Sequence, residues 1–316
     1  EELQQIADRI VSMAEPGEQI EAVVAWSRDT EVRAFEGEVE HFVSADSAGV
    51  GIRMISQGKQ GLSWAGVLDD AALKECLAEA RDNASFGSED PNAGLAEPDG
   101  VEPEELSLFD ERLVHADTEE KIRLAIELEA QVRAGDPRIF GIESADYADS
   151  VMATALASTT GIRRSSAETS VYLGVYALAG DEEDTTTGFG FSVGRALQDL
   201  DLAFAAQEAV QRCVRLLGAT KAPSERLTVV LHPYVTSQFL SLIAEMLSGE
   251  SVIRGRSPFA GRVGEEIAAP SLTMFDDATD PLSPTASDTD GEGLACRRVP
   301  LIDAGVLSGY MHNAYT

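Results

Sequence analysis

The acidic, glycine-rich stretch at residues 288–293, Asp-Thr-Asp-Gly-Glu-Gly, is the first candidate for chemistry because it looks like the head of a calcium loop. An EF-hand loop needs carboxylates at its positions 1, 3 and 5, glycine at position 6 and a bidentate glutamate at position 12. If Gly291 is position 6, Asp288 and Asp290 occupy positions 3 and 5. Position 1 is then Ala286 and position 12 is Arg297, so one ligand is missing and another is replaced by a cation. We therefore expect no calcium site here.

Residues 190–194, Gly-Phe-Ser-Val-Gly, match the G-x-S-x-G pattern of a nucleophile elbow. In an elbow the serine follows an apolar strand, and a helix begins immediately after it. Here the acidic run DEEDTTT precedes the motif, and the next helix starts only after Asp199. We therefore interpret Ser192 as part of a small-residue strand or loop and not as a nucleophile.

The histidines and the remaining carboxylates give no clearer site. No histidine has a second histidine at metal-chelating spacing, and HExxH, GxxxxGK[ST] and a strand–GxGxxG–helix pattern are all absent from the sequence. The four histidines are His41, His115, His232 and His312. His115 and Asp117 lie at a predicted helix entry, where capping is the simpler role. Asp276-Asp277 and the acidic residues at 288–292 are expected to be solvated loop carboxylates. The residue types alone thus define no catalytic group and no metal site.

The composition excludes several classes of partner. The chain has 24 Lys and Arg against 55 Asp and Glu, a formal charge of −31, so it should repel nucleic acid and anionic membranes. No apolar run approaches the roughly 18 residues of a membrane span, and no basic-then-apolar leader is present. The odd number of cysteines (Cys76, Cys213, Cys296), without CxxC pairing, indicates free thiols in a reducing compartment. We expect a cytoplasmic protein without nucleic-acid or membrane partners.

The first segment that could position a site combines a helix, a strand-rich region and a second helix. An apolar stripe marks a helix within residues 1–15, and residues 20–66 are rich in β-formers. Turn-forming residues at 28–29, 45–47 and 57–59 predict an antiparallel meander broken at these three places. A helix capped by Asp69 or Asp70 follows. Its predicted apolar side is Leu73, Cys76, Leu77 and Ala80.

The second segment repeats this plan after a polar, Pro/Gly-rich linker at residues 83–104. Asp117 and Glu120 form a capping pair for a helix over 118–135, a second meander follows, and another helix covers 201–217. The third segment opens with the apolar run LTVVLHP, which predicts a buried strand, followed by a helix. The sequence therefore predicts an α+β fold, with two helix-flanked antiparallel β-meander units followed by a β-rich C-terminal domain. The expected domains are 1–95, 104–219 and 224–316.

The third segment resembles the TldD/TldE family, in which TldE is also called PmbA and is described as a modulator of DNA gyrase. The residues that carry the resemblance are Ser-Gly-Glu at 248–250, Arg256-Ser257, Gly261-x-x-Gly264, Asp276-Asp277, Glu292-Gly293 and Leu-Ile-x-x-Gly-Val-Leu at 301–307. The resemblance continues upstream through residues 118–150 and 31–42, and so covers nearly the whole chain. It implies that residues 288–293 are the family's acidic turn leading into a strand, with Gly291 in place of one Asp. The family continues beyond the last residue of this sequence, so the resemblance also implies an incomplete C-terminal domain.

The resemblance implies a zinc peptidase assembled from two related subunits. In the TldD branch a helix carries HExxxH, whose histidines bind zinc and whose glutamate acts on the water. The positions that match this motif here are Leu240, Ser241 and Glu245. Leucine cannot ligate zinc, which is bound in proteins by Cys, His, Asp or Glu. The chain is therefore similar to the TldE/PmbA branch, and we expect no cofactor in this chain and zinc in a TldD-like partner.

We predict a non-catalytic subunit that completes a substrate chamber and holds an unfolded peptide by strand addition. By resemblance the assembly would serve peptide-antibiotic maturation and antitoxin turnover. The predicted peptide-groove residues are Arg256, Ser257, Phe259, Arg262 and Gly264, although Gly261 and Gly264 are equally well explained as turn residues.

Two other classes stay open from the sequence. One is a stand-alone, metal-free peptide-binding homodimer in place of a heterodimer with a TldD-like subunit. The other is a direct modulator of DNA gyrase, in which an acidic protein could mimic DNA on a basic surface. A self-sufficient peptidase is least expected because it would need a metal site that the sequence does not offer.

Overall fold

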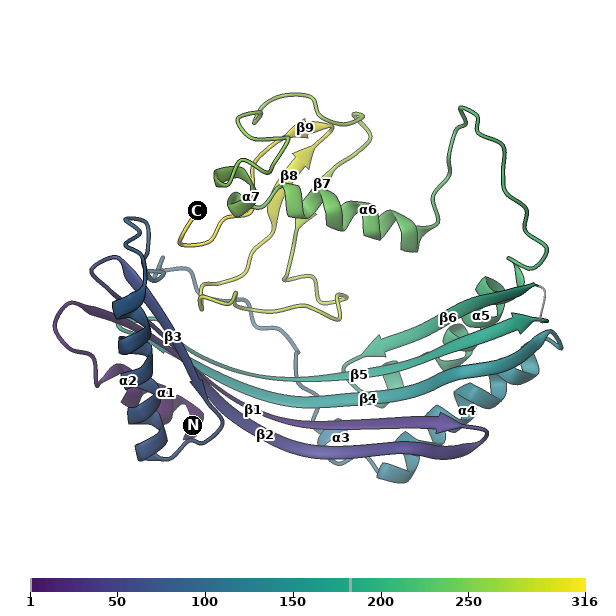
Figure 1. The fold of residues 1–316 in the computed structure, drawn as a ribbon, viewed down its shortest axis with the longest axis horizontal. Helices are drawn as coiled ribbons and strands as arrows, with labels where there is room; N and C mark the ends of the chain where they lie inside the picture. The colour runs from purple at the N-terminus through teal and green to yellow at the C-terminus, as the bar shows by residue number, and fades with distance from the viewer. Residues whose placement is uncertain (1, 182–183) are drawn as a thin grey trace.

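A long, curved six-stranded sheet forms the centre of the molecule (Figure 1), as described by a computed structural model for residues 2–181 and 184–316. All neighbouring strands are antiparallel, in the order β3-β2-β1-β4-β5-β6. The strands are β1 (Glu18–Phe35), β2 (Glu38–Ser56), β3 (Lys59–Ala65), β4 (Ile139–Ser158), β5 (Arg163–Gly180) and β6 (Thr185–Gly194). The two predicted meanders are β1–β3 and β4–β6, and they join edge to edge through β1 and β4. The predicted α+β fold with two helix-flanked meanders is confirmed.

Four long helices cover one face of this sheet. They are α1 (Glu2–Val11), α2 (Asp70–Phe86), α4 (Thr118–Gly135) and α5 (Leu202–Val214), and the short α3 (Glu111–Val114) and η1 (Leu197–Asp199) lie in the connections. Alternate residues of β1 point toward the helices, because side chains in a strand alternate between its two faces. Ile20, Ala22 and Val24 belong to the core that includes residues of α1 and α2, whereas Val32 and Ala34 belong to the core that includes residues of α4 and α5. Two cores thus sit under the two ends of one sheet.

Capping side chains fix where the helices begin. Asp69 accepts hydrogen bonds from two backbone N–H groups at the start of α2, and Asp117 accepts one at the start of α4, as their spacing predicted. Glycines in the sheet then let two helices approach closely. A Cβ atom on Gly61 would lie 2.0 Å from a backbone oxygen of α2, and one on Gly190 would lie 1.9 Å from a backbone oxygen of α5. Both contacts are with helix backbone, so only glycine fits beneath either helix.

Two of the three turns expected in the first meander are wrong. Strand β1 runs through residues 28–29 and β2 runs through residues 45–47 without interruption. The polar residues pair across the strands instead, since Arg28 forms an ion pair with Asp46 at 2.7 Å. Cross-strand pairs of opposite charge stabilise a sheet whose faces are both solvated at this point. The turn at residues 57–58 is confirmed, and the other hairpin turn lies at Glu36 and Gly37, both in the left-handed region.

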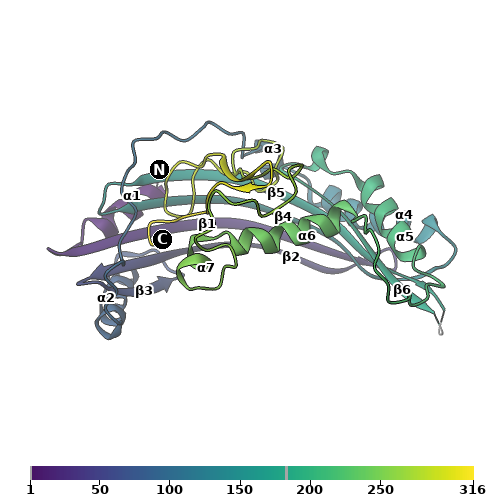
Figure 2. The same cartoon turned by 90° about the horizontal axis from the view of Figure 1, so that it is seen from above.

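The third segment lies over the concave side of the sheet (Figures 1 and 2). It contains α6 (Pro233–Met246), α7 (Gly249–Ile253) and a small antiparallel sheet of β7 (Met274–Asp276), β8 (Val299–Asp303) and β9 (Val306–Leu307). Leu247, Leu301, Ile302 and Leu307 form its small core. The prediction of a buried strand at LTVVLHP is wrong, because this run is irregular and Val230 is 93 % exposed. Among the described residues no strand pairs with this run, and Leu227 and Val229 are exposed as well.

The three cysteines are free, as the sequence indicated, and Cys76 and Cys213 are buried on α2 and α5. Within residues 2–181 and 184–316 no helix combines the length and the apolar character needed to cross a lipid bilayer.

Candidate functional site

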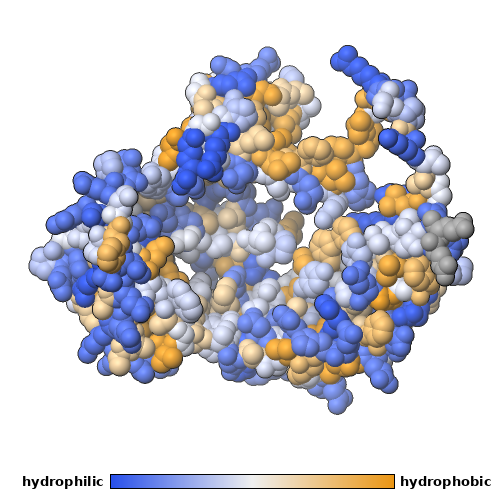
Figure 3. Space-filling model, in the orientation of Figure 1, coloured by the Kyte–Doolittle hydropathy of each residue, from blue (hydrophilic) through white to orange (hydrophobic). Residues whose placement is uncertain are grey.

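The face of the six-stranded sheet opposite the helices, called here the inner face, is largely uncovered. On β1 it carries Glu31 and Arg33, which alternate with the buried Val32 and Ala34. The third segment touches this face at both ends but leaves its middle open, and Figure 3 shows the molecule hollowed between the sheet and α6. The middle of the inner face is therefore accessible to solvent, and residues of the third segment lie over both of its ends.

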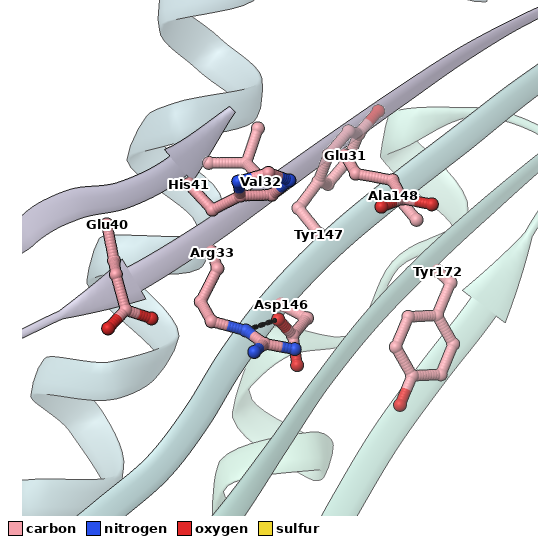
Figure 4. A pocket seen from close by; sticks show the side chains of 9 residues that line it. All are labelled: Glu31, Val32, Arg33, Glu40, His41, Asp146, Tyr147, Ala148 and Tyr172. Atoms are coloured by element: carbon pink, nitrogen blue, oxygen red, sulfur yellow. Dashed lines mark hydrogen bonds and ion pairs between the residues drawn. The ribbon is translucent and has the colours of Figure 1, made fainter. Parts of the chain in front are cut away.

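Two adjoining hollows occupy the open middle of the inner face. The larger, of about 630 Å³, is lined on β1 and β2 by Glu31, Arg33, Glu40 and His41, and on β4 and β5 by Asp146 and Tyr172 among others (Figure 4). The second, of about 380 Å³, shares Glu31 and Tyr172 and reaches the loop at Pro284 and Thr285. Together they form a groove, called here the inner groove, which runs across the strands from this loop to β2.

The inner groove is polar and acidic on its β1 and β4 side. Arg33 donates to Asp146 across neighbouring strands at 2.7 Å, and this hydrogen bond raises the pKa of the guanidinium, with smaller contributions from Glu40 and Glu31. One cation thus faces three carboxylates. On the adjacent strand, burial raises the pKa of Tyr172, and the charge on Asp146 raises it further. The tyrosine therefore keeps its proton at neutral pH, and the groove offers hydrogen-bonding and charged groups.

The acidic turn at residues 288–293 continues the loop that begins at Pro284, and it lies on the inner face outside the two hollows. The carboxylate of Asp290 accepts hydrogen bonds from the N–H groups of Glu292 and Leu294, both at 2.9 Å, so it caps a tight turn. Leu294 packs against the inner face with Val23 and Leu156. The prediction of an acidic turn is confirmed by this geometry, in which one oxygen of the Asp290 carboxylate accepts both hydrogen bonds.

Arg195 anchors this loop to the sheet by hydrogen bonds, and Glu21 of β1 lies close to the carboxylates of the loop. Arg195 donates to the carbonyl oxygens of Ala286 at 3.0 Å and Leu108 at 3.2 Å, and so ties the loop to the linker before α3. Burial raises the pKa of Glu21; Arg53 lowers it, but the nearby charges of Glu292 and Asp290 raise it again, and the net shift is upward. The loop is therefore anchored by Arg195, and Arg53 lies between the carboxylates of Glu21, at 3.1 Å, and Glu292, at 4.0 Å.

The outer edge of β2 is open beside the inner groove. Strand β3 pairs with β2 only from Val50 to Ser56, so residues 38–49 have no partner strand on that side among the described residues. Side chains 38–48 are exposed on both faces of β2. An unpaired edge presents a row of free backbone donors and acceptors, and so can accept an additional strand.

The motifs examined in the sequence have structural roles. Ser192 lies within β6, and its hydroxyl accepts a hydrogen bond from the N–H of Asp201 at 2.9 Å, so no strand–serine–helix elbow forms. His115 ends α3, Asp117 caps α4, and the His232 ring accepts a hydrogen bond at the start of α6. Within residues 2–181 and 184–316 no three His, Cys, Asp or Glu side chains are grouped so that they could hold a metal ion.

Leu240, Ser241 and Glu245 all lie on α6. The Ser241 hydroxyl donates to the carbonyl oxygen of Ser237, one turn earlier, at 3.0 Å. No α6 side chain is fully buried, and the helix carries exposed apolar residues such as Phe239 and Leu242. The helix thus presents a mixed hydroxyl and hydrocarbon surface.

The five residues predicted to form a peptide groove follow α7. Ser257 is buried and its Oγ accepts from the N–H of Phe259, whose ring packs on the small C-terminal core. Arg262 pairs with Glu265 at 2.7 Å, and Gly264 is left-handed with φ of +88°. Arg256 is exposed. Among the described residues, none of the five lines either hollow of the inner groove, and their role in peptide binding stays a prediction.

Sequence reasoning did not single out the groove residues that the structure brings together. Glu31, Arg33, Asp146 and Tyr172 come from three strands that are neighbours only in the folded sheet. The available signal was the alternation of Glu31-Val32-Arg33-Ala34, which marks a strand with one solvated face.

Comparison with known proteins defines the class as metallopeptidase-related. Three family models match consecutive parts of the chain: PmbA/TldA metallopeptidase domain 1 at residues 20–84, the central domain at 111–217 and the C-terminal domain at 224–316. The chain belongs to the PmbA/TldD family, also written TldD/TldE.

Its similarity to individual family members is distant but extends over most of the chain. It is 24 % identical over 300 residues to metalloprotease PmbA of Escherichia coli O157:H7, covering 93 % of this chain and 66 % of that protein. It is 26 % identical over 278 residues to a metalloprotease TldD homolog of Haemophilus influenzae, covering 84 % and 57 %. The chain thus spans less than two thirds of the length of these curated relatives.

Two solved structures share the fold. One is TldE from Thermococcus kodakarensis, with a TM-score of 0.81 and 22 % identity, over 99 % of this chain and 70 % of that one. The other, from Thermotoga maritima, was named as a proposed modulator of a DNA gyrase; its TM-score is 0.83 at 22 % identity, over 99 % and 71 %.

The residues of α6 do not fit the zinc ion that the family implies. Leu240 has only carbon atoms in its side chain, and the Ser241 hydroxyl already donates to its own helix. Glu245 alone could coordinate a metal, whereas zinc sites take three or four ligands from Cys, His, Asp or Glu. No chemical step is therefore assigned to a metal on this helix.

Proposed function

We propose that this chain is the non-catalytic, TldE/PmbA-like subunit of a TldD/TldE-type zinc metallopeptidase that acts on unfolded peptides in the cytoplasm. The observation that carries the proposal is the occupation of the HExxxH positions by Leu240, Ser241 and Glu245 on α6. A hydrocarbon side chain and a hydroxyl engaged with its own helix cannot replace an imidazole ligand and the carboxylate that acts on water. Zinc would be held by a homologous TldD-like partner.

The role of this subunit would be to hold the peptide while the partner cleaves it. The open edge of β2 at residues 38–49 supports strand addition, which binds any extended peptide through its backbone. The inner groove beside this edge offers room and polar groups for the peptide's side chains. Within this proposal the loop at residues 256–264, with the exposed Arg256, is a second peptide contact on the third segment. Peptide-antibiotic maturation and antitoxin turnover are the processes we propose for such an assembly.

Reconstitution with a TldD-like protein tests this proposal. The chain alone, the partner alone and the two together are incubated with an unfolded peptide, and each protein is analysed for zinc after dialysis without chelator. We expect zinc in the partner only and cleavage that requires both proteins. Ser241→Ala should leave the rate unchanged, whereas removal of the motif glutamate in the partner should abolish it. Stoichiometric zinc in this chain, or cleavage by this chain alone, would overturn the proposal.

A second candidate is a stand-alone, metal-free peptide-binding homodimer, because an open strand edge can also pair with its own copy. Co-purification with an HExxxH protein would count against it. The name of the Thermotoga maritima protein favours a gyrase modulator as a third candidate. Unchanged supercoiling by gyrase at a saturating concentration of this chain would dismiss that possibility.

A further inference from the structure

Aromatic side chains gather at the β5–β6 end of the inner groove. Tyr172 and Tyr176 on β5 and Phe189 and Phe191 on β6 share the inner face. Tyr176 is the cross-strand partner of Phe189, and Tyr172 and Phe191 lie four and two residues from these partners, on the same face of their strands. Tyr172 is 41 % exposed and Phe191 36 % exposed. We call these four residues the aromatic patch.

The aromatic patch is pre-organised by stacking and by one glycine. The rings of Tyr172 and Phe191 stack with centroids 6.3 Å apart and planes 18° apart, and Phe189 and Phe191 stack at 6.5 Å and 10°. A Cβ on Gly174 would lie 2.4 Å from the Tyr172 ring, so this ring lies flat across the glycine. Aromatic rings that cover a strand glycine in this way are held in one orientation. The exposed ring faces are therefore fixed before any ligand arrives.

The N-terminal end of α6 contacts this patch through Tyr234. The Tyr234 ring contacts Phe189 edge-on at 5.1 Å, and the guanidinium of Arg212 lies 4.5 Å from the Phe189 ring centre and 5.3 Å from that of Tyr234. These contacts engage Phe189, whereas Tyr172 lines both hollows and the partly exposed Phe191 stacks on it. The patch is thus covered by Tyr234 and Arg212 at Phe189 and is accessible at Tyr172, next to the hollows.

The charge of the adjoining hollow decides what kind of ligand suits the patch. Next to Tyr172, Arg33 is the only guanidinium or ammonium among the described residues that line the two hollows, and it faces Asp146, Glu31 and Glu40. The chain as a whole carries a formal charge of −31, which attracts cations and repels anions over the length of a groove. Aromatic faces also attract cations. Charge complementarity therefore favours a positively charged occupant.

We propose that the aromatic patch and the acidic hollow beside it form one selective subsite for extended peptides that carry aromatic side chains next to Lys or Arg. This inference rests on the proposed peptide-binding function and adds a preference that strand addition alone would not give. Backbone pairing at an open edge is indifferent to sequence, whereas stacked rings and an excess of carboxylates over cations discriminate between side chains.

Anisotropy titrations of the full chain with three fluorescein-labelled ten-residue peptides test the preference. The first peptide alternates Lys and Phe with Ser spacers, the second replaces Phe by Ala, and the third replaces Lys by Glu. We expect the Lys/Phe peptide to bind tightest. Phe191→Ala should weaken its binding roughly 3- to 10-fold and leave the Lys/Ala peptide unchanged, since one aromatic contact is lost. Phe86→Ala, at an 83 % exposed phenylalanine at the end of α2, is the matched control and should change nothing.

A charge variant keeps the test independent of the aromatic rings. Glu31→Gln combined with Glu40→Gln should weaken both lysine peptides by roughly 3-fold at low salt, and the effect should vanish at high salt because exposed charges are screened. Glu75→Gln, on the exposed side of α2, is the control. Circular dichroism confirms that each variant is folded.

The outcomes separate this inference from the function on which it rests. Equal binding of all three peptides, or an unchanged affinity of Phe191→Ala for the Lys/Phe peptide, would overturn the subsite while peptide binding itself stands. No binding of any peptide at millimolar concentration would remove both. A dimer in solution that Phe191→Ala dissociates would overturn the subsite by showing that a second copy covers the patch.

Discussion

Replacing Arg195 by methionine should release residues 284–296 from the inner face. The Arg195 guanidinium donates to Ala286 O at 3.0 Å and to Pro284 O at 3.4 Å in this loop, and to Leu108 O at 3.2 Å and Thr169 O at 3.3 Å in its surroundings. Its side chain is only 16 % exposed, so water cannot easily take over these bonds. Methionine keeps much of the volume but donates nothing.

The magnitude follows from the two bonds to the loop. A hydrogen bond from a charged donor contributes about 1.5–3 kcal/mol, and the bond to Pro284 is near the distance limit and adds little. The loop should therefore become about 2–3 kcal/mol easier to open, which corresponds to roughly 30- to 150-fold faster hydrogen exchange by the relation of 1.4 kcal/mol per factor of ten.

Hydrogen–deuterium exchange with mass spectrometry measures this directly. The N–H of Ser287, which donates to Ala278 O, and that of Cys296, which donates to Asp288 O, report on the closed loop. Arg138→Met is the matched control, because Arg138 pairs with the neighbouring Asp136 and is 54 % exposed. If exchange over 284–296 changes less than two-fold in a folded Arg195→Met protein, the view that this guanidinium anchors the loop is refuted.

Three further predictions concern the sheet and its turns. Gly190→Ala should lower the free energy of unfolding by about 1–3 kcal/mol in chemical denaturation, because the added Cβ would meet the backbone of α5. Gly51→Ala, with open space around it, is the control and should be neutral or stabilising. Equal effects of the two variants would contradict the packing argument. The raised pKa of Glu21 means that its contribution to stability is full below the ordinary value of 4.5 and is lost as pH rises through the higher folded value. The stability of the wild type relative to Glu21→Gln should therefore fall from pH 4 to pH 7 in parallel denaturation curves, and a rise would refute the burial argument. Glu129→Gln should lower the free energy of unfolding by about 1–3 kcal/mol and speed amide hydrogen exchange at Gly37, because the buried carboxylate accepts hydrogen bonds from two N–H groups of the β1–β2 turn. Unchanged exchange at Gly37 would argue against this role.

The sequence was most informative where one residue acts on its immediate neighbours. Asp69 and Asp117 were recognised as caps because a capping bond spans only two or three residues, and the apolar side of α2 followed from spacing alone. It was least informative in the long strands. Residues 28–29 and 45–47 are polar and small, as in turns, so their composition predicted breaks in the strands. In the structure they lie opposite one another on β1 and β2, and the Arg28–Asp46 ion pair stabilises the pairing of these strands.

The family is determined by sequence alone, and a leucine at position 240 lacks donor atoms for a metal in any conformation. The alternation in β1 likewise determines that Glu31 and Arg33 share a face. Only the tertiary structure decided which residues meet on that face. The β1–β4 pairing joins residues more than a hundred positions apart in the sequence and brings Asp146 to Arg33. The β5–β6 register stacks Tyr172 on Phe191. Strand register and edge choice are set by the combined packing of helices, glycines and loops around the whole sheet, and no local pattern in one strand specifies its partner.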